Sequence, residues 1–197
     1  MLLKTERLLL RRFTPDDFEA FRAYAADPSL CRMLGWADLT NKNAAWEVFN
    51  GLLNEEGTCA IVDARLGRVI GNISFKPPHP HLAQDERLKP HRGGCLSFAL
   101  SAQRRREGLA QEAAEAVMCH QFLTERVDYI NCGFFSFNEP SRRLQERLGF
   151  HFFSTHRFRL GKEEIEVIEN ILWREEYLAL VSGNDGSKNF DERAVTP

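Results

Sequence analysis

A run of arginines followed by glycine, from Arg104 to Gly108, is the stretch of this sequence best suited to binding an anion. After it, small apolar residues at positions 110, 113, 114 and 117 have the spacing of one helix face, which predicts a helix. A helix start leaves backbone N–H groups unpaired and carries partial positive charge, so it attracts phosphate. Gly108 has no Cβ, so a ligand can approach its backbone closely. The stretch fits a pyrophosphate group, although a solvated basic turn has the same composition.

A second stretch, from Asn138 to Phe150, has the pattern of a short capped helix. Asn138 is a residue type that caps helices, and Pro140 is tolerated in a first turn. Leu144 and Leu148 then form an apolar pair four residues apart, before a glycine that ends the pattern. Taken alone, this stretch predicts an ordinary helix.

Together the two stretches resemble the GNAT superfamily of acetyl-CoA-dependent N-acyltransferases. The family's phosphate loop, Q/R-x-x-G-x-G/A, is matched by RREGLA at residues 105–110. Its later helix starts Asn-x-x-Ser or Asn-x-x-Ala and often ends leucine-glycine-phenylalanine, matched by Asn138, Ser141 and residues 148–150. The opening, LKTERLLLR at residues 3–11, resembles the branch of ribosomal-protein N-terminal acetyltransferases (Rim-type). The resemblance covers residues 3–175 and is most specific in the order of the motifs.

The resemblance implies an α/β (α+β) fold with a mixed, mostly antiparallel central sheet flanked by helices. It implies transfer of an acetyl group from acetyl-CoA to a primary amine, by direct attack in a ternary complex. The acceptor is then a protein N-terminus or a small-molecule amine. The implied acetyl-CoA contacts are the backbone at Phe98, Ala99 and Leu100, the loop residues Arg105, Arg106, Glu107, Gly108, Leu109 and Ala110 with Gln111, and the helix-start residues Asn138 and Ser141.

Three residues depart from the family pattern. Arg106 stands where a glycine is frequent, Gln145 where many members carry a tyrosine as the acid, and Cys95 where some carry a carboxylate. Glutamine cannot act as an acid. A thiol with a pKa near ~8.5 can nevertheless leave without a strong acid at neutral pH. Ser141 therefore has two open roles, proton donor to the thiolate or plain cap and cofactor contact. The alternative function is a non-catalytic acyl-CoA-binding regulatory module on the same fold.

The general base is sought in the proline-rich segment from Lys76 to Gly94. Asp85, Glu86 and His91 are the candidates, of which Glu86 is taken as the catalytic residue, although each also fits a solvated loop position. A weak base slightly favours an α-amine with a pKa near ~8 over a lysine. The same segment contains His79-Pro80-His81, but the intervening proline and the lack of a nearby cysteine argue against a metal site. We expect no metal.

Composition limits the classes of protein that this chain can belong to. With 197 residues and 43% hydrophobic content, it is most simply one domain, residues 1–181, followed by a tail of low apolar density, residues 182–197. A net charge of −2 argues against general nucleic-acid binding, so an RNA or DNA contact by the arginine run is the least favoured alternative. Five scattered cysteines without a C-x-x-C pair indicate reduced thiols in a cytoplasm. The sequence indicates neither a signal peptide nor a membrane span, and it leaves a homodimer open.

The helices, strands and loops that the sequence predicts must position the candidate residues. The long segment 76–94, with four prolines, predicts a loop at the rim of the active site. Asp27-Pro28-Ser29 is expected to interrupt the first helix. The remaining pattern predicts strands at 8–10, 58–62, 69–75, 96–100, 129–135, 151–158 and 166–172, and helices from residue 14 to 25 and from about 40 to 53.

Overall fold

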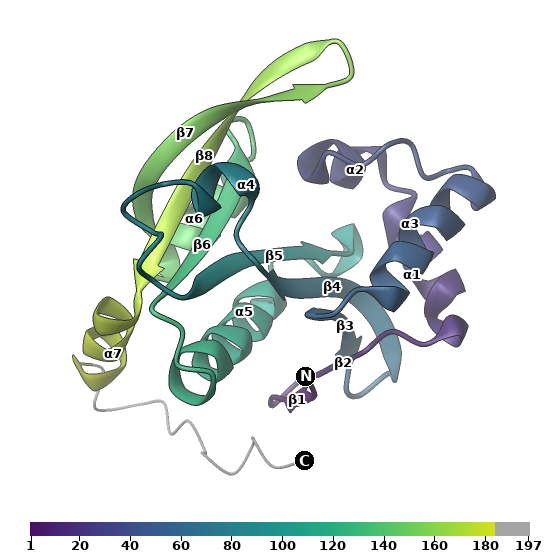
Figure 1. The fold of residues 1–197 in the computed structure, drawn as a ribbon. Helices are drawn as coiled ribbons and strands as arrows, with labels where there is room; N and C mark the ends of the chain where they lie inside the picture. The colour runs from purple at the N-terminus through teal and green to yellow at the C-terminus, as the bar shows by residue number, and fades with distance from the viewer. Residues whose placement is uncertain (184–197) are drawn as a thin grey trace. The chain divides into compact units, whose positions relative to one another are not determined.

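The computed structural model describes residues 1–183, which divide into two compact units. Unit one comprises residues 1–75 and 97–116, and unit two comprises residues 76–96 and 117–183. The ribbon is shown in Figure 1. The chain passes between the units at the end of strand β4 (Arg68–Lys76), within strand β5 (Gly93–Leu100) and within helix α5 (Leu109–Cys119).

Unit one contains an antiparallel series of strands in the order β1-β2-β3-β4. The hairpin predicted around Gly67 is confirmed, and this glycine has a positive φ of 64°. The second half of β5 adjoins β4, because the amide of Ser101 donates to the carbonyl of Ile70 at 2.8 Å. The strand bounds are β1 (Leu3–Lys4), β2 (Leu8–Arg11), β3 (Thr58–Asp63) and β4 (Arg68–Lys76).

The helices of unit one bury an aromatic core. Phe18, Phe21 and Phe49 are buried, and the Phe21 and Phe49 ring centroids are 5.4 Å apart. The helices predicted to start near residues 14 and 40 are confirmed, because each carries apolar side chains on one face. Their bounds are η1 (Pro15–Asp17), α1 (Phe18–Ala25), α2 (Pro28–Leu34), α3 (Lys42–Asn54) and η2 (Ala102–Arg104).

Helix α2 corrects the sequence prediction. We expected Asp27-Pro28-Ser29 to interrupt the chain, and instead these residues begin a helix. The Asp27 carboxylate accepts a hydrogen bond from the Ser29 amide at 2.9 Å, and Pro28 takes the first helical position. Aspartate at the cap and proline at the next position are a helix-start signal, which the sequence reading had taken as a break.

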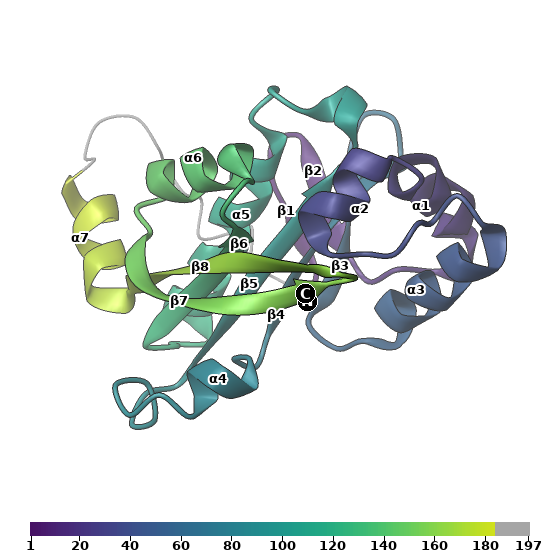
Figure 2. The same cartoon turned by 90° about the horizontal axis from the view of Figure 1, so that it is seen from above.

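Unit two is built on β5, β6, β8 and β7, in that order of pairing. The first half of β5 pairs with β6 in parallel, whereas β6–β8 and β8–β7 are antiparallel. Helices α4 and α6 cover opposite faces of this sheet (Figure 2). The element bounds are α4 (Pro80–Ala83), η3 (His120–Thr124), β6 (Tyr129–Phe135), α6 (Glu139–Arg147), β7 (His151–Leu160), β8 (Glu163–Trp173) and α7 (Arg174–Gly183).

The proline-rich segment after β4 is more regular than predicted. Instead of an unstructured loop it forms the short helix α4, in which Pro80 lies in the tolerated first turn. Leu82 and Leu88 are almost fully buried against Cys95 and Tyr129. Strand β5 also begins at Gly93, before the predicted start at Leu96. The segment is thus anchored to the sheet by apolar burial, which the proline and histidine content had hidden.

The predicted fold class is confirmed, because the strand pairs are mixed in direction and mostly antiparallel and helices flank them. Of the predicted tail, Ser182 and Gly183 end helix α7, and residues 184–197 lie outside the described residues. Within residues 1–183, no helix has both the length and the apolar character needed to cross a bilayer.

Candidate active site

The predicted phosphate loop lies in unit one, between η2 and the start of α5. Two of its residues have left-handed backbone conformations, Arg106 with a φ of 66° and Gly108 with a φ of 78°. Arg106 therefore adopts the conformation for which a glycine is the usual residue. Gly108 is exposed at the start of α5, where backbone N–H groups lack intrahelical partners. The loop is thus a helix N-terminus open to an anion.

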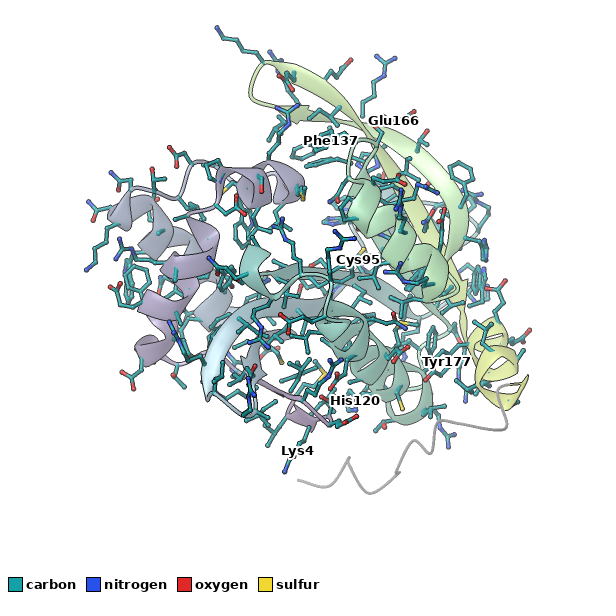
Figure 3. The ribbon with its side chains drawn as sticks, turned by 180° about the vertical axis from the view of Figure 1, so that it is seen from behind. Lys4, Cys95, His120, Phe137, Glu166 and Tyr177 are labelled. Carbon is teal, nitrogen blue, oxygen red and sulfur yellow. The ribbon has the colours of Figure 1, made fainter. Side chains whose placement is uncertain are left out.

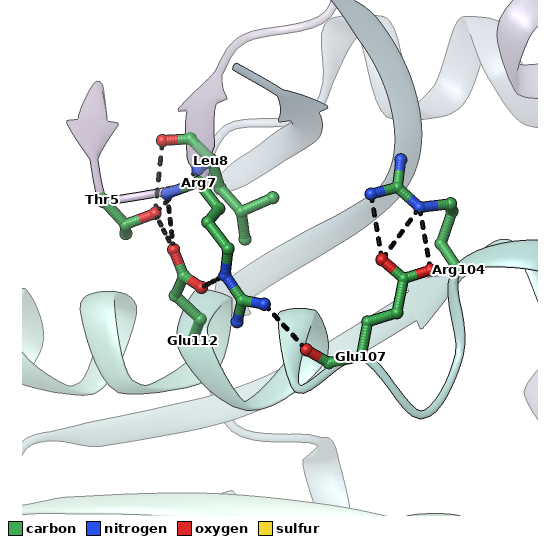
Figure 4. A network of polar contacts seen from close by, with 6 residues as sticks. All are labelled: Thr5, Arg7, Leu8, Arg104, Glu107 and Glu112. Carbon is green, nitrogen blue, oxygen red and sulfur yellow. Dashed lines mark hydrogen bonds and ion pairs between the residues drawn. The ribbon is translucent and has the colours of Figure 1, made fainter. Parts of the chain in front are cut away.

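The amino-terminal segment braces this helix start (Figure 4). The Arg7 Nε donates to a Glu112 carboxylate oxygen at 2.6 Å, and Arg7 Nη1 donates to the Glu107 carbonyl at 2.9 Å. Thr5 Oγ1 donates to the other Glu112 oxygen at 2.5 Å. Burial raises the pKa of Glu112, but the hydrogen bonds from Thr5 and Arg7 outweigh it and hold that pKa below its ordinary value. Sequence reasoning missed this network because its partners are about a hundred positions apart.

The three arginines of the loop are not equivalent. Arg104 forms ion pairs with Asp63 at 2.6 Å and with Glu107 at 3.1 Å. Arg105 Nη2 lies 3.6 Å from the Asp27 carboxylate. Arg106 is exposed, and within residues 1–183 it forms no ion pair. Of the three loop arginines, Arg106 is therefore the one whose charge is not shared with a carboxylate of the described residues.

The other predicted acetyl-CoA contacts of unit one lie on β5, immediately before this loop. Ala99 and Leu100 are buried and Phe98 is half-buried. The glycine opposite them, Gly71 on β4, lets the two backbones approach, because a Cβ there would lie 2.2 Å from the Ala99 carbonyl oxygen. The structure thus brings Phe98–Leu100 and the loop together in one unit.

In unit two, Asn138 and Ser141 lie at the start of α6 as predicted. The Asn138 side chain accepts a hydrogen bond from the Ser141 amide at 3.2 Å, which caps the helix. Gln145 Nε2 donates to the Ser141 hydroxyl oxygen at 3.0 Å, and Gln145 Oε1 accepts from Asn170 Nδ2 at 3.0 Å. Since Gln145 occupies an acceptor position of the hydroxyl oxygen, the Ser141 O–H remains able to donate to a ligand.

The base candidates of the segment 76–94 lie at the surface of unit two. Glu86 is exposed, and Lys89 Nζ donates to it at 2.5 Å. Asp85 accepts hydrogen bonds from Arg87, which lower its pKa to about 2 and make it a weak base. His91 lies 3.9 Å from Asp128. The role of Glu86 as the base stays a prediction.

Cys95, which stands at the family's carboxylate position, is an inert thiol. Its Sγ donates to Asn131 Oδ1 at 2.9 Å in the interior of unit two, and the residue is labelled in Figure 3. Burial raises the pKa of Cys95 to about 12, so the thiol stays protonated at neutral pH. Cys95 therefore does not replace the missing carboxylate as a base.

Comparison with known proteins agrees with this geometry. The family model described as Acetyltransferase (GNAT) domain matches residues 7–151. The uncharacterized N-acetyltransferase YoaA of Bacillus subtilis is 28% identical over 154 residues, covering 76% of this chain and 82% of YoaA.

Solved structures have the same fold. A GNAT-family acetyltransferase from Bacillus anthracis matches with a TM-score of 0.77 and 20% identity, over 89% of this chain and all of that one. Spermidine N-acetyltransferase from Vibrio cholerae, solved with CoA and spermine, matches with a TM-score of 0.68 and 15% identity, over 88% of this chain and 98% of that one. At such identities these two likenesses show the fold alone.

Proposed function

The chain belongs to the GNAT acetyltransferase family and is an N-acetyltransferase that uses acetyl-CoA, and from this premise we propose that it transfers the acetyl group by direct attack in a ternary complex. The acceptor is a primary amine, either a protein N-terminus or a small molecule. The observation that carries the proposal is the open start of α5, where Arg106 and Gly108 both have positive φ. Direct transfer needs a held thioester, a neutral amine and a stabilised leaving thiolate.

The residues at the start of α5 fit the diphosphate of acetyl-CoA. The N–H groups from Gly108 to Gln111 stand at the helix start, where they lack intrahelical partners, and supply neutral donors. Gly108 leaves space beside them, and the exposed Arg106 adds one full charge. Arg104 and Arg105 are held by carboxylates, so their part is to shape the loop. The backbone at Phe98–Leu100 would receive the pantetheine arm and the thioester oxygen, as the family resemblance implies.

Ser141 would act on the leaving sulfur as a hydrogen-bond donor. The chain from Asn170 through Gln145 fixes the hydroxyl oxygen and leaves its hydrogen directed to a further acceptor. A serine hydroxyl is too weak an acid to protonate a thiolate fully, but a donor to a charged acceptor contributes about 1.5–3 kcal/mol. We therefore propose that Ser141 donates a hydrogen bond to the thiolate, a weaker form of the proton-donor role, and is more than a plain cap and cofactor contact.

Glu86 stays the proposed base, acting after it leaves Lys89. A carboxylate this exposed is a weak base, which fits an acceptor that is already partly neutral, such as an α-amine with a pKa near ~8. The Rim-type resemblance of residues 3–11 also favours a protein N-terminus. Thr5 and Arg7 within that stretch hold the start of α5 in place. Their contacts explain a structural role for the motif and do not themselves identify the acceptor.

We further propose that the chain folds as one domain, since the family match runs from residue 7 to 151 through both units. Free thiols at all five cysteines support a cytoplasmic location. We include a homodimer in the proposal, and the molecular mass of the protein in solution tests it.

The test is thermal unfolding with and without excess acetyl-CoA, followed by release of free thiol with a panel of peptides and small amines. We expect acetyl-CoA to raise the midpoint by mass action. Gly108→Trp should abolish the rise, because a side chain is strained at a φ of 78° and would fill the helix start. Thiol release only in the presence of an amine supports direct transfer.

Other outcomes identify the alternatives. A raised midpoint without thiol release on any amine would indicate the regulatory module, for which Gln145 in place of the tyrosine is the argument. Salt-sensitive binding of RNA would support the nucleic-acid alternative.

A further inference from the structure

Two histidines and a buried glutamate meet on the α4 face of unit two, in a cluster that the acetyl-transfer proposal does not use. His81 Nε2 lies 3.2 Å from Glu169 Oε1, and His156 Nδ1 lies 3.5 Å from the same oxygen. All three ligand atoms lie within 4.8 Å of one another. The two imidazole rings are 4.0 Å apart between centroids.

Three separate elements bring these side chains together. In the β7–β8 register Glu169 pairs with Ser154, so His156, two residues further along β7, projects from the same face. His81 comes from α4, which lies over this face. Short-range sequence patterns do not reveal the cluster, because His81 and Glu169 are 88 positions apart.

The glutamate is fixed before any ligand arrives. Only 2% of its side chain is exposed, and Asn131 Nδ2 donates to its second oxygen at 2.7 Å. Gly133 lies opposite on β6, and a Cβ there would come within 2.7 Å of the carboxylate. A buried carboxylate held by an amide is typical of a ligand oriented by its neighbours.

One nitrogen of the cluster has no hydrogen-bond partner. His156 Nδ1 is buried and makes no hydrogen bond within the described residues. A buried polar atom without a hydrogen bond is unfavourable and rare in folded proteins, so such a nitrogen beside a carboxylate needs an explanation. A cation between His156 Nδ1 and Glu169 would use the nitrogen lone pair and offset the buried negative charge together.

Ligand type and ligand spacing together indicate the class of cation. Four ligands at Zn–N and Zn–O distances of about 2.0–2.2 Å are separated by about 3.3–3.5 Å at the edges of a tetrahedron. Of the two separations from Glu169 Oε1, the 3.5 Å to His156 Nδ1 falls within that range and the 3.2 Å to His81 Nε2 lies just below it. Octahedral ions with the same bonds need about 3.0 Å, and Ca²⁺ or Mg²⁺ prefer oxygen ligands. The third separation, between His81 Nε2 and His156 Nδ1, would shorten to a tetrahedral edge if the His81 side chain rotated. That side chain is 36% exposed and has room to rotate.

We propose that His81, His156 and Glu169 form a zinc-type site for a divalent transition metal. The site supplies three protein ligands and leaves the fourth position to water or another small donor, as in open zinc sites. His81 binds through Nε2 and carries its proton on Nδ1, while His156 binds through Nδ1. The metal would join α4 to β7 and β8, and its binding does not depend on the proposed acetyl transfer.

The experiment uses untagged full-length protein, stripped with a chelator and titrated with Zn²⁺ and with Co²⁺. We expect one metal ion per chain, the intense visible absorption of four-coordinate Co²⁺, and a Zn²⁺-dependent rise in the unfolding midpoint. His156→Gln and His81→Gln should each weaken binding by about 100-fold and abolish the absorption. His151→Gln is the matched control, since His151 lies on the same strand but pairs with Glu176 at the surface.

Circular dichroism in the presence of chelator checks that each variant folds. His81→Gln is the variant expected to disturb folding least, because the His81 side chain is exposed. A wild-type protein that binds less than one metal ion per chain at saturation would overturn the proposal. So would equal binding by wild type and His156→Gln, or an equal loss in His151→Gln. Acetyl-CoA binding is measured on the same samples, and its failure would count against the proposed function alone.

Discussion

At the scale of single residues, Gln145 changes what Ser141 can do. A tyrosine at this position would itself be an acid, whereas the buried glutamine passes its hydrogen bonds from Asn170 to the serine hydroxyl. The departure from the family pattern therefore does not leave α6 without a donor. In the proposed mechanism the donor is instead Ser141, in the first turn of the helix.

Ser141→Ala should lower kcat by about 10-fold or more with little change in KM, because the lost hydrogen bond is strongest to the developing thiolate. Steady-state thiol release measures both constants. Ser182→Ala, the same chemical change at an exposed position of α7, is the control and should leave kcat unchanged. An unaltered kcat in Ser141→Ala would reduce Ser141 to a cap residue.

Arg106 combines an unpaired charge with a left-handed backbone. Arg106→Ala should weaken CoA binding by about 5-fold and leave the binding of pantetheine, which lacks the diphosphate, unchanged. Arg105→Ala should have a smaller effect, since that charge is already shared with Asp27. Calorimetry with both ligands distinguishes these cases, and equal weakening for pantetheine would contradict the assignment.

The same position carries backbone strain that glycine relieves. Arg106→Gly should be more stable than Arg106→Ala by about 1 kcal/mol, because a φ of 66° costs an L-residue about 1–2 kcal/mol. Urea unfolding of the two variants compares them at equal charge. A less stable glycine variant would mean that the loop does not hold this conformation in solution.

At the scale of elements, the start of α5 depends on the segment that precedes β2. Glu112 in the first turns of α5 receives hydrogen bonds from Thr5 and Arg7, and Arg7 continues to the Glu107 carbonyl. The position of the phosphate loop is therefore set partly by the amino terminus. Substitutions at residues 5–7 should therefore change the affinity of any ligand that binds to this loop.

Glu112→Gln should destabilise the protein by about 1–3 kcal/mol at neutral pH. The folded pKa of Glu112 lies below its unfolded value, so its contribution is complete above about pH 4.3 and is lost as pH falls through the folded pKa. The wild type should therefore lose its advantage over Glu112→Gln in acid. Urea unfolding from pH 3 to 7 checks this, and a constant difference across that range would contradict it.

At the scale of the whole molecule, the thiols report on the packing of both units. Cys31, Cys59, Cys95 and Cys132 are buried, and Cys119 is half-buried. Burial raises the pKa of Cys132 well above its ordinary value, and burial also raises the pKa of Cys119. Because only the thiolate reacts, native thiols should be slow.

A thiol reagent at pH 8 should therefore modify Cys119 first in the native protein, and all five cysteines only in denaturant. Mass spectrometry of the labelled peptides gives the order. The unfolding midpoint should also be the same with and without reductant, since every cysteine is free. Rapid labelling of Cys95 or Cys132 would show that unit two opens far more easily than its packing indicates.

The sequence by itself determined the elements and the motifs, because these depend on local patterns. The apolar spacing after Gly108, the cap at Asn138 and the hairpin at Gly67 are written within a few residues each, and the structure has them where they were predicted. The same local reading failed at Asp27-Pro28-Ser29 and around Pro80, where proline starts helices instead of ending structure.

Only the tertiary structure decided which polar groups meet. Arg104 and Arg105 are neutralised by Asp63 and Asp27, and Arg106 is not, although the three are identical neighbours in sequence. Likewise, His156 and Glu169 join His81 through strand register and the packing of α4. Such contacts depend on burial and on partners distant along the chain, so no short-range pattern encodes them.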